Sequence, residues 1–313
     1  MAETPPAAPA TDLPSQRTDA EAEADYLVAE PLQDVMVSVI DTLEDLSKEP
    51  RLTGLPTGFT DLDSLTGGLQ PGTLTVIASR PSVGRTTLLS DICRHAAIRN
   101  AAPTAVFSLE ESPEDFANRI LAAQARVPLW HLRGGRLDDD GWARLARHAK
   151  ELAEAPLHIS APPYMTTAML CADVHELHEE HTLQLVAVDG IQDLWPEKRN
   201  DLREREVGDA VRDLKRLARE LHIPIVATAH LNRRSDQRSD RVPALDELRE
   251  SGAITFVADV IVLLHREDAY DRLSPRAGEA DLIVAKYRHG PTATITVAHQ
   301  GHYGRFVNLP PGM

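Results

Sequence analysis

The chain has 313 residues, of which 42% are hydrophobic and 26% charged, and its formal net charge is −15 at pH 7. This composition is typical of a folded globular protein and excludes a collagen-like or wholly disordered chain. No apolar run approaches the roughly 18 residues of a membrane span, and the first residues lack the order of a signal peptide. We therefore expect a cytoplasmic protein with no membrane partner. The two cysteines, Cys93 and Cys171, are too few for a disulfide framework or a zinc site and are interpreted as packing residues.

The acidic residues are concentrated at the start of the chain. Residues 1–50 contain 12 acidic and 2 basic residues, which leaves a net charge of −5 for the other 263 residues. The overall charge therefore neither supports nor excludes nucleic-acid binding, because the local field of a groove or pore matters more than the sum.

Residues 1–28 are rich in Pro, Ala, Thr and acidic residues, which predicts a disordered acidic tail. An amphipathic linker helix is predicted within residues 29–50, because apolar residues recur there at steps of three and four. These apolar positions are Leu32, Val35, Met36, Val39, Ile40, Leu43 and Leu46. From the pattern alone, the helix packs either on its own domain or on a neighbouring subunit.

Residues 51–313 are predicted to form one α/β domain, because short apolar runs alternate with helical segments, as in a parallel sheet covered by helices. The predicted strands are 74–79, 104–109, 183–188, 223–229 and 259–264, and the predicted helices lie near 86–99, 113–126, 139–153, 166–180 and 203–221. Short alternating runs between residues 280 and 308 predict antiparallel strands at one edge of the sheet.

A loop suited to binding phosphate follows the first predicted strand and opens a helix, a place where backbone N–H groups and a helix N-terminus face an anion. We call it the phosphate loop; it comprises Ser79, Arg80, Pro81, Ser82, Val83, Gly84, Arg85, Thr86 and Thr87. Against the pattern G-x-x-x-x-G-K-[ST] it matches at Gly84 and Thr86 and departs at Ser79 and Arg85. A Gly-containing turn with an exposed arginine is the alternative if this segment is taken alone.

Several long motifs taken together resemble the RecA-like ATPase domain of DnaB-type replicative helicases. The motifs are TGLPTGFTDLDSLTGGLQPGTLTVIASRPSVGRTTL, FSLEES, VAVDGIQDL, DELRESGAI and AKYRHGPT, and they follow the family's order over about residues 30–308. The resemblance implies a P-loop NTPase core with a mostly parallel sheet. It also implies a homo-hexameric ring that encircles single-stranded DNA and moves 5′ to 3′ using ATP and Mg²⁺.

The resemblance assigns roles to single residues in the nucleotide site. Gly84 and Thr86 hold the phosphates and Mg²⁺, Arg85 stands where the family has its phosphate-binding lysine, Glu110 activates the attacking water, and Asp189 acts on Mg²⁺. Lys286 and Arg288 reach into the adjacent subunit's site, with Arg288 as the arginine finger. The resemblance also favours docking of the linker helix on the next subunit.

Two loops are the candidates for binding DNA. One follows the fourth predicted core strand and carries Arg233, Arg234, Arg238 and Arg241. The other contains Arg249, Glu250 and Gly252 and matches the family's pore loop. Arginines without aromatic neighbours predict salt-dependent contact with the DNA backbone rather than base stacking. An exposed loop of mixed charge is the alternative reading of the arginines.

The sequence departs from the family pattern at the nucleotide site. Arg85 replaces a compact ammonium by a planar fork, which predicts retained nucleotide binding and slower hydrolysis. His230 stands where the family usually has a glutamine that senses the γ-phosphate, and Gly190 stands where an aromatic residue often follows the acidic Asp. The family's N-terminal helical domain is represented only by the acidic tail, so we expect a replication-associated paralogue that does not engage primase.

Two further functions stay open at this stage. One is a non-catalytic nucleotide- and DNA-binding assembly protein, and the other is a RecA-like recombination accessory ATPase. His175, His178 and His181 lie at helical spacing and could bind a metal, although a polar helix face is the favoured interpretation.

Overall fold

The structure, a computed structural model, describes residues 29, 31–49, 51–197, 202–232 and 241–310. The chain divides into two compact units, residues 1–51 and residues 52–313. The predicted tail, residues 1–28, lies outside the described residues. No helix in the described ranges is long and apolar enough to cross a membrane.

The first unit contains the helix α2 (Leu32–Lys48), which confirms the helix predicted from the apolar spacing. Asp34 in its first turn and Lys48 in its last turn complement the helix dipole. None of its side chains is buried, and Leu32 and Leu43 are 74% and 60% exposed. The helix therefore carries an exposed apolar face.

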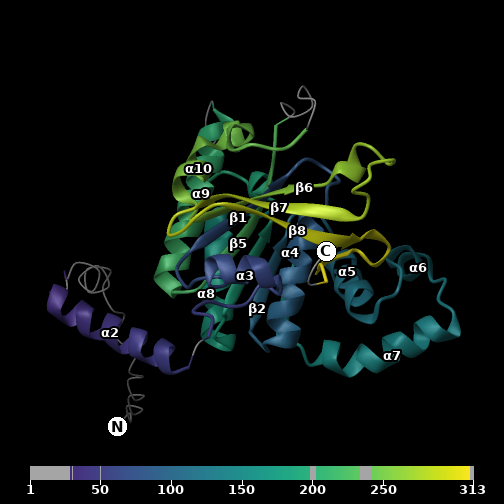
Figure 1. Cartoon of the computed structure of the whole chain (residues 1–313), viewed down its shortest axis with the longest axis horizontal. Coiled ribbons are helices and arrows are strands. Elements are labelled where there is room, and N and C mark those ends of the chain that lie inside the picture. Colours follow the sequence, from purple (N-terminus) through teal and green to yellow (C-terminus); the bar gives the residue numbers. More distant parts are fainter. Residues whose placement is uncertain (1–28, 30, 50, 198–201, 233–240, 311–313) are drawn as a thin grey trace, which may run out of the picture. The chain divides into compact units, whose positions relative to one another are not determined.

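The described part of the second unit is built on a nine-stranded sheet in the order β3-β2-β4-β5-β1-β6-β7-β8-β9 (Figure 1). The strands are β1 (Leu74–Ser79), β2 (Thr104–Ser108), β3 (Leu157–Ser160), β4 (Leu185–Asp189), β5 (Ile225–His230), β6 (Val260–His265), β7 (Glu279–Tyr287), β8 (Ala293–Gln300) and β9 (Arg305–Asn308). Strands β1 to β6 pair in parallel, and β7, β8 and β9 continue the sheet antiparallel. The predicted fold class and the antiparallel C-terminal edge are both confirmed.

Helices pack on both faces of this sheet (Figure 1). The α-helices are α3 (Thr60–Thr66), α4 (Arg85–Arg94), α5 (Pro113–Ala125), α6 (Leu129–Gly134), α7 (Asp139–Ala153), α8 (Thr167–His181), α9 (Arg203–Leu221) and α10 (Gly252–Val257). A π-helical turn, η1 (His95–Arg99), extends α4, and the short 3-10 turns are η2 (Ile191–Asp193), η4 (Leu245–Ser251), η5 (Glu267–Ala269) and η6 (Gly301–Tyr303).

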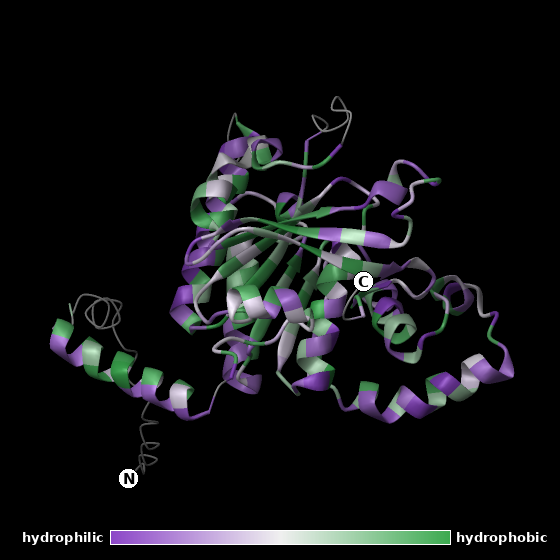
Figure 2. Cartoon of the chain, in the orientation of Figure 1, coloured by the Kyte–Doolittle hydropathy of each residue, from purple (hydrophilic) through white to green (hydrophobic). Residues whose placement is uncertain are grey.

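The alternation of side chains along β1 explains why the core has two parts. Leu74, Val76 and Ala78 point to one face and pack with residues of α8, α9 and α10, whereas Ile77 points to the other face and packs with α4 and α5. Figure 2 shows the strands as mostly hydrophobic and the helices as two-sided, as expected for a sheet buried on both faces.

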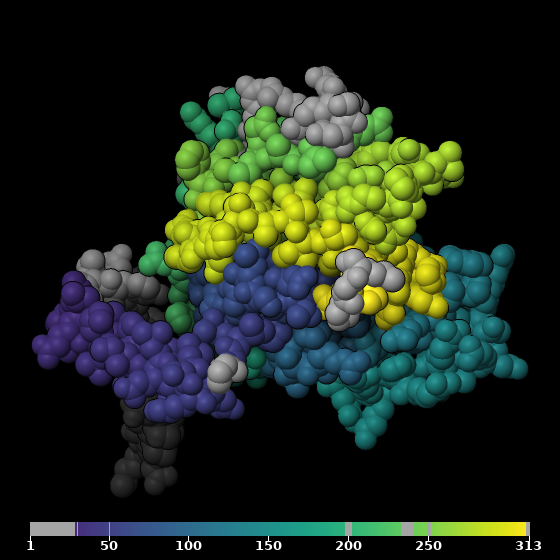
Figure 3. Space-filling model, viewed as in Figure 1, coloured from purple at the N-terminus to yellow at the C-terminus, as the bar shows by residue number. Residues whose placement is uncertain are grey.

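The C-terminal strands lie against the start of the domain. Figure 3 shows β8 and β9 (yellow) beside the segment that carries α3 (blue). Asn308 accepts a hydrogen bond from the Thr60 N–H at 3.0 Å and donates one to the Gly58 carbonyl, also at 3.0 Å. Strand β9 is thereby tied to the segment that precedes α3.

The predicted strands agree with the structure to within about two residues, and the main differences are short elements. The strand β3 and the helix α6 were not predicted. The four residues of β3 are all half-buried, because this strand lies at the edge of the sheet, and such a position leaves only a weak apolar signal. Strand β5 begins at Ile225, after Pro224, which has no N–H to donate to a ladder.

Candidate nucleotide site

The phosphate loop joins β1 to α4 at the carboxyl edge of the parallel strands, where ligands bind in open α/β sheets. Gly84 has φ +115° and precedes the first residue of α4. A Cβ placed there would lie 3.1 Å from Phe306 Cζ, so the backbone conformation favours glycine and the packing against Phe306 disfavours a larger residue. The Leu231 N–H donates to the Ser79 carbonyl at 3.1 Å and joins the loop to the end of β5.

Arg85 points back across the sheet and contacts two residues from other strands. Its guanidinium forms an ion pair with Glu110 Oε1, beyond the end of β2. Nη1 lies 2.6 Å from Nδ1 of His230 and Nη2 lies 2.7 Å from Nε2. Because a neutral imidazole has one acceptor nitrogen, only one of these two contacts is a hydrogen bond. The buried Arg85 is thus held by residues of the same chain.

Glu110 is correspondingly stabilised as a carboxylate. The hydrogen bond with His230, whose Nε2 lies 3.3 Å from Oε1, is the largest cause, and the charge of Arg85 adds to it; together they lower the pKa of Glu110 to about 2. A carboxylate held in this way is a weak base. The arrangement therefore opposes the role that the resemblance implies for Glu110.

Asp189 ends β4 and is fully buried. Thr228 on β5 donates a hydrogen bond to Oδ1 at 2.7 Å and accepts one from the Gly190 N–H at 2.8 Å. Oδ2 is buried without a hydrogen-bond partner of good geometry. Burial raises the pKa of Asp189, and the hydroxyls of Thr228 and, more weakly, Thr86 act in the opposite sense. A buried oxygen left unpaired beside a helix-start threonine fits a bound Mg²⁺, the metal that the resemblance implies.

The loop after β4 contributes residues that the sequence analysis did not single out. Gln192 accepts a hydrogen bond from the His230 N–H at 3.2 Å and donates one to the His230 carbonyl at 3.3 Å. Asp193 lies with Glu110 and His230 in one group whose ligand atoms are all within 4.8 Å of one another. Burial and the charge of Glu110 raise the pKa of Asp193. The sequence signal that could have indicated Asp193 was its position four residues after Asp189, in the same loop.

Lys286 and Arg288 lie near the start of β1, whereas the phosphate loop follows the end of this strand. Lys286 pairs with Ile261, which itself pairs with Val76 near the start of β1. The ammonium donates to the carbonyls of Thr255 at 2.7 Å and Ala258 at 2.6 Å. Most of the length of β1, whose six residues span about 16 Å, therefore separates Lys286 from the phosphate loop.

Arg288 shares this position. Its Nε lies 3.2 Å from Asp259 Oδ1, and Asp259 also binds Lys215 and the Leu74 N–H at the start of β1. The structure therefore does not bring Lys286 or Arg288 to Arg85 and Glu110 of the same chain.

Of the predicted DNA-binding residues, Arg233, Arg234 and Arg238 lie outside the described residues. Arg241 is exposed, and its guanidinium lies 5.4 Å from the centre of the Tyr270 ring. Arg249 and Glu250 belong to η4, and Gly252 begins α10. The Asn232 N–H donates to the Glu247 carbonyl at 3.0 Å, which links the segment after β5 directly to η4.

Two of the three α8 histidines have partners outside the helix, whereas Nδ1 of His178 is buried without a hydrogen-bond partner. His175 faces Glu220 at 3.4 Å and His181 stacks on His158, with ring centres 4.1 Å apart. The group of potential metal ligands that the described residues form is instead Glu110, Asp193 and His230. The favoured interpretation, a polar helix face, fits these contacts.

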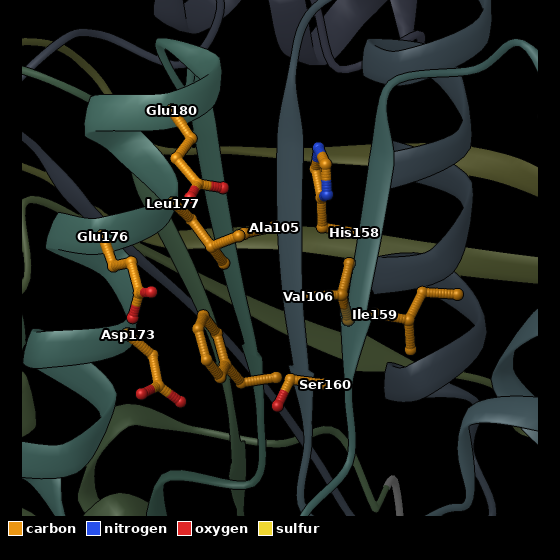
Figure 4. A pocket seen from close by; sticks show the side chains of 10 residues that line it. Ala105, Val106, His158, Ile159, Ser160, Asp173, Glu176, Leu177 and Glu180 are labelled. Atoms are coloured by element: carbon orange, nitrogen blue, oxygen red, sulfur yellow. The ribbon is translucent and has the colours of Figure 1, made fainter.

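A separate cavity of about 400 Å³ lies between α8 and the strands β2 and β3 (Figure 4). Asp173, Glu176 and Glu180 line one side, and His158 and Ser160 line the other. No residue of the phosphate loop lines it, and three carboxylates repel phosphate groups. The nucleotide site is therefore not in this cavity.

The two predicted packing cysteines are free thiols. Cys93 is buried and Cys171 partly buried. Both pack against the core, and burial raises the pKa of each thiol, that of Cys171 to about 11. They are therefore poor nucleophiles.

The sheet is mostly parallel with helices on both faces, a glycine turn joins β1 to α4, and acidic residues follow β2 and end β4. These features define an α/β domain of the RecA-like ATPase type. The chain belongs to the DnaB-like helicase family: residues 54–308 match the family described as "DnaB-like helicase C terminal domain".

Curated relatives and solved structures agree with this assignment. The replicative DNA helicase DnaB of Leifsonia xyli subsp. xyli is 46% identical over 282 residues, covering 90% of this chain and 62% of that protein. The replicative DNA helicase DnaC of Bacillus subtilis is 35% identical over 280 residues, covering 89% and 62%. The chain thus spans less than two thirds of the length of these relatives.

Among solved structures, one described as an ATPase domain has a TM-score of 0.86 and 30% identity, and the match covers 90% of this chain and all of that one. A DnaB-like replicative helicase, described with its interactions with primase, has a TM-score of 0.83 and 28% identity over 93% of this chain and 72% of that one. A KaiC-like protein of Pyrococcus horikoshii OT3, at TM-score 0.57 and 15% identity, shares the fold.

Proposed function

We propose that the chain is an ATP-dependent DNA helicase or translocase that works as a homo-hexameric ring on single-stranded DNA, with 5′ to 3′ movement. The observation that supports this most is the separation of the two halves of the site. Thr86, Glu110 and Asp189 meet at one end of the sheet, whereas Lys286 and Arg288 lie at the other. This separation supports a site that a neighbouring copy completes with its Lys286 and Arg288.

Within one subunit, Gly84 and the N-terminus of α4 bind the phosphates of ATP, and Thr86 and Asp189 hold Mg²⁺, which neutralises phosphate charge. Glu110 orients the attacking water and accepts its proton once Arg85 has left it for the phosphates. Arg288 of the next subunit stabilises the charge that develops on the γ-phosphoryl group.

A short path of hydrogen bonds supports coupling between nucleotide and DNA. The Leu231 N–H binds Ser79 of the phosphate loop, and the Asn232 N–H binds Glu247 in η4. A shift of His230 on nucleotide binding therefore moves the segment that contains Arg249 and Gly252. We propose that this segment and the arginines after β5, including Arg241, contact the DNA backbone.

We further propose that the division of the chain is functional. Residues 51–313 are the motor domain, and residues 29–50 dock on the next subunit through the exposed apolar face of α2, including Leu32 and Leu43. Burial of this face in a ring removes apolar surface from water and favours assembly.

A second candidate function is a nucleotide- and DNA-binding assembly protein with little hydrolysis. The contacts of Arg85 with Glu110 and His230 favour it, because they hold the catalytic carboxylate in an ion pair. The two candidate functions require the same fold and the same ligands, and they differ in the rate of ATP hydrolysis.

Subunit mixing tests the proposed shared site. The variant Thr86→Ala lacks part of its own phosphate site, and Arg288→Ala lacks the group it gives to its neighbour together with its own ion pair to Asp259, so each alone is expected to be inactive. Random mixing in equal amounts restores complete sites at about a quarter of the interfaces. DNA-stimulated hydrolysis near a quarter of wild type supports the proposal.

A mixture no more active than its two parents would contradict the shared site. The matched control is a mixture of Arg288→Ala with Lys286→Ala. Both variants lose a group given to the neighbour, so this mixture is expected to regain little activity.

A further inference from the structure

We propose that Glu110, Asp193 and His230 form a binding site for a divalent transition-metal ion, distinct from the Thr86–Asp189 position, and that the Arg85 guanidinium occupies it in the absence of metal. The site does not depend on ATP hydrolysis by this chain. It goes beyond the proposed function because it adds a second cation position with different ligands.

The three ligands come from neighbouring parts of one sheet edge. Glu110 follows β2, Asp193 ends η2 just after β4, and His230 ends β5, and these strands are adjacent in the order β2-β4-β5. One ligand atom from each side chain lies within 4.8 Å of the other two. A metal ion at bonding distance from all three needs only small rotations of these side chains.

The backbone is shaped to place Asp193 in this group. Gly190 has φ +104°, and a Cβ on it would lie 2.3 Å from Asp193 Oδ2 and 3.3 Å from Glu110 Oε1. Any residue other than glycine would push the carboxylate away. Glycine at position 190, a departure from the family pattern, thus makes room for the Asp193 carboxylate.

The charges of the group are not balanced by Arg85. The guanidinium contacts Glu110 and His230, but within the described part of the chain the Asp193 carboxylate accepts no hydrogen bond and forms no ion pair. Glu110 and Asp193, both exposed, thus carry two negative charges against the single positive charge of Arg85, so a divalent ion balances the local charge better than the guanidinium does.

The donor set selects the kind of metal. Mg²⁺ and Ca²⁺ prefer oxygen ligands, whereas one imidazole and two carboxylates suit Zn²⁺, Co²⁺ or Mn²⁺. Three protein ligands leave positions open for water or for a phosphate oxygen. When nucleotide phosphates attract Arg85, the position between Glu110 and His230 becomes free for the metal.

Titration with Co²⁺ in the absence of nucleotide tests the site, because Co²⁺ bound to imidazole has a visible absorption band. Arg85→Ala is expected to bind Co²⁺ about tenfold more tightly than wild type, and adding Asp193→Asn to lower the affinity again by about tenfold. Arg85→Gln serves as a second variant of similar side-chain length if Arg85→Ala is poorly folded, which circular dichroism reports.

The α8 histidines are the matched control, because exposed histidines also bind Co²⁺. The variant His175→Ala/His181→Ala is expected to keep the Arg85-sensitive binding. Co²⁺ affinity that is unchanged in both Arg85 variants, or that is insensitive to Asp193→Asn, would overturn the proposal, as would loss of all binding with the α8 variant. A chain that binds Co²⁺ in this way but hydrolyses no ATP would refute the proposed motor and leave the metal site standing.

Discussion

The ion pair between Arg85 and Glu110 predicts that Arg85→Lys raises ATP turnover. Lysine keeps the positive charge but carries a single ammonium in place of the fork, so it cannot contact Glu110 and His230 together. Glu110 is then free to act on the attacking water.

The expected size of the rise in turnover follows from the pKa of Glu110. The fall in the pKa of Glu110 from 4.5 to about 2 corresponds to about 3 kcal/mol. The Glu110 side chain is 27% exposed, and His230 is the larger cause, so we assign Arg85 about 1 to 1.5 kcal/mol. This corresponds to roughly a tenfold rise in turnover. The loss of two buried contacts lowers the free energy of unfolding by about 1 to 2 kcal/mol.

The assay is phosphate release at ATP concentrations well below KM, where the cost of moving Arg85 from Glu110 to the phosphates counts, and at a protein concentration that supports assembly, with urea unfolding measured in parallel. Arg276→Lys is the control: Arg276 pairs with Asp281 on β7 through two nitrogens, at 2.7 and 2.6 Å, and contacts neither Glu110 nor the phosphate loop. It is expected to lose stability without gaining turnover. Turnover of Arg85→Lys at or below that of wild type, with the expected loss of stability, would refute the reasoning.

Three further predictions follow from the described contacts. Burial raises the pKa of Asp91 to about 6, so its contribution to the free energy of unfolding is fully present below about pH 4 and is lost as the pH rises to about 6. In urea unfolding, wild type should therefore lose about 3 kcal/mol over this pH range, and Asp91→Asn should not show this loss. Gly84→Ala should lower the free energy of unfolding by about 1 to 3 kcal/mol, because alanine is strained at φ +115°. Phe306→Leu relieves only the contact with the ring, so full recovery of stability in the double variant would contradict the role of φ. Ile40→Glu/Leu43→Glu should abolish rings in sedimentation without changing the melting temperature, and intact rings would refute docking by α2.

Much of the fold was predictable because its signals are local. The parallel strands are buried on both faces, so they read as continuous apolar runs, and α9 shows a clear periodicity with Val207, Val211 and Leu214 buried. The half-buried edge strand β3 and the six-residue helix α6 were not predictable in the same way. Their residues depend on neighbours that are distant in sequence.

The site was predictable only in part, because motifs identify residue types and not contacts. The sequence singles out the phosphate loop, Glu110, Asp189 and His230, and these residues lie at one edge of the sheet. The partnership of Arg85 with Glu110 and His230, residues 25 and 145 positions away, arises from strand order. Asp193 was missed because a single carboxylate after a strand is usually solvated.

The most direct test of the motor is ATP hydrolysis by the wild-type chain with and without single-stranded DNA, at a concentration that supports ring assembly. We expect slow hydrolysis that DNA stimulates and that declines on dilution, because the active site needs two subunits. Measurable ATP binding with no turnover in either condition, at any concentration, would contradict the motor and favour the assembly protein.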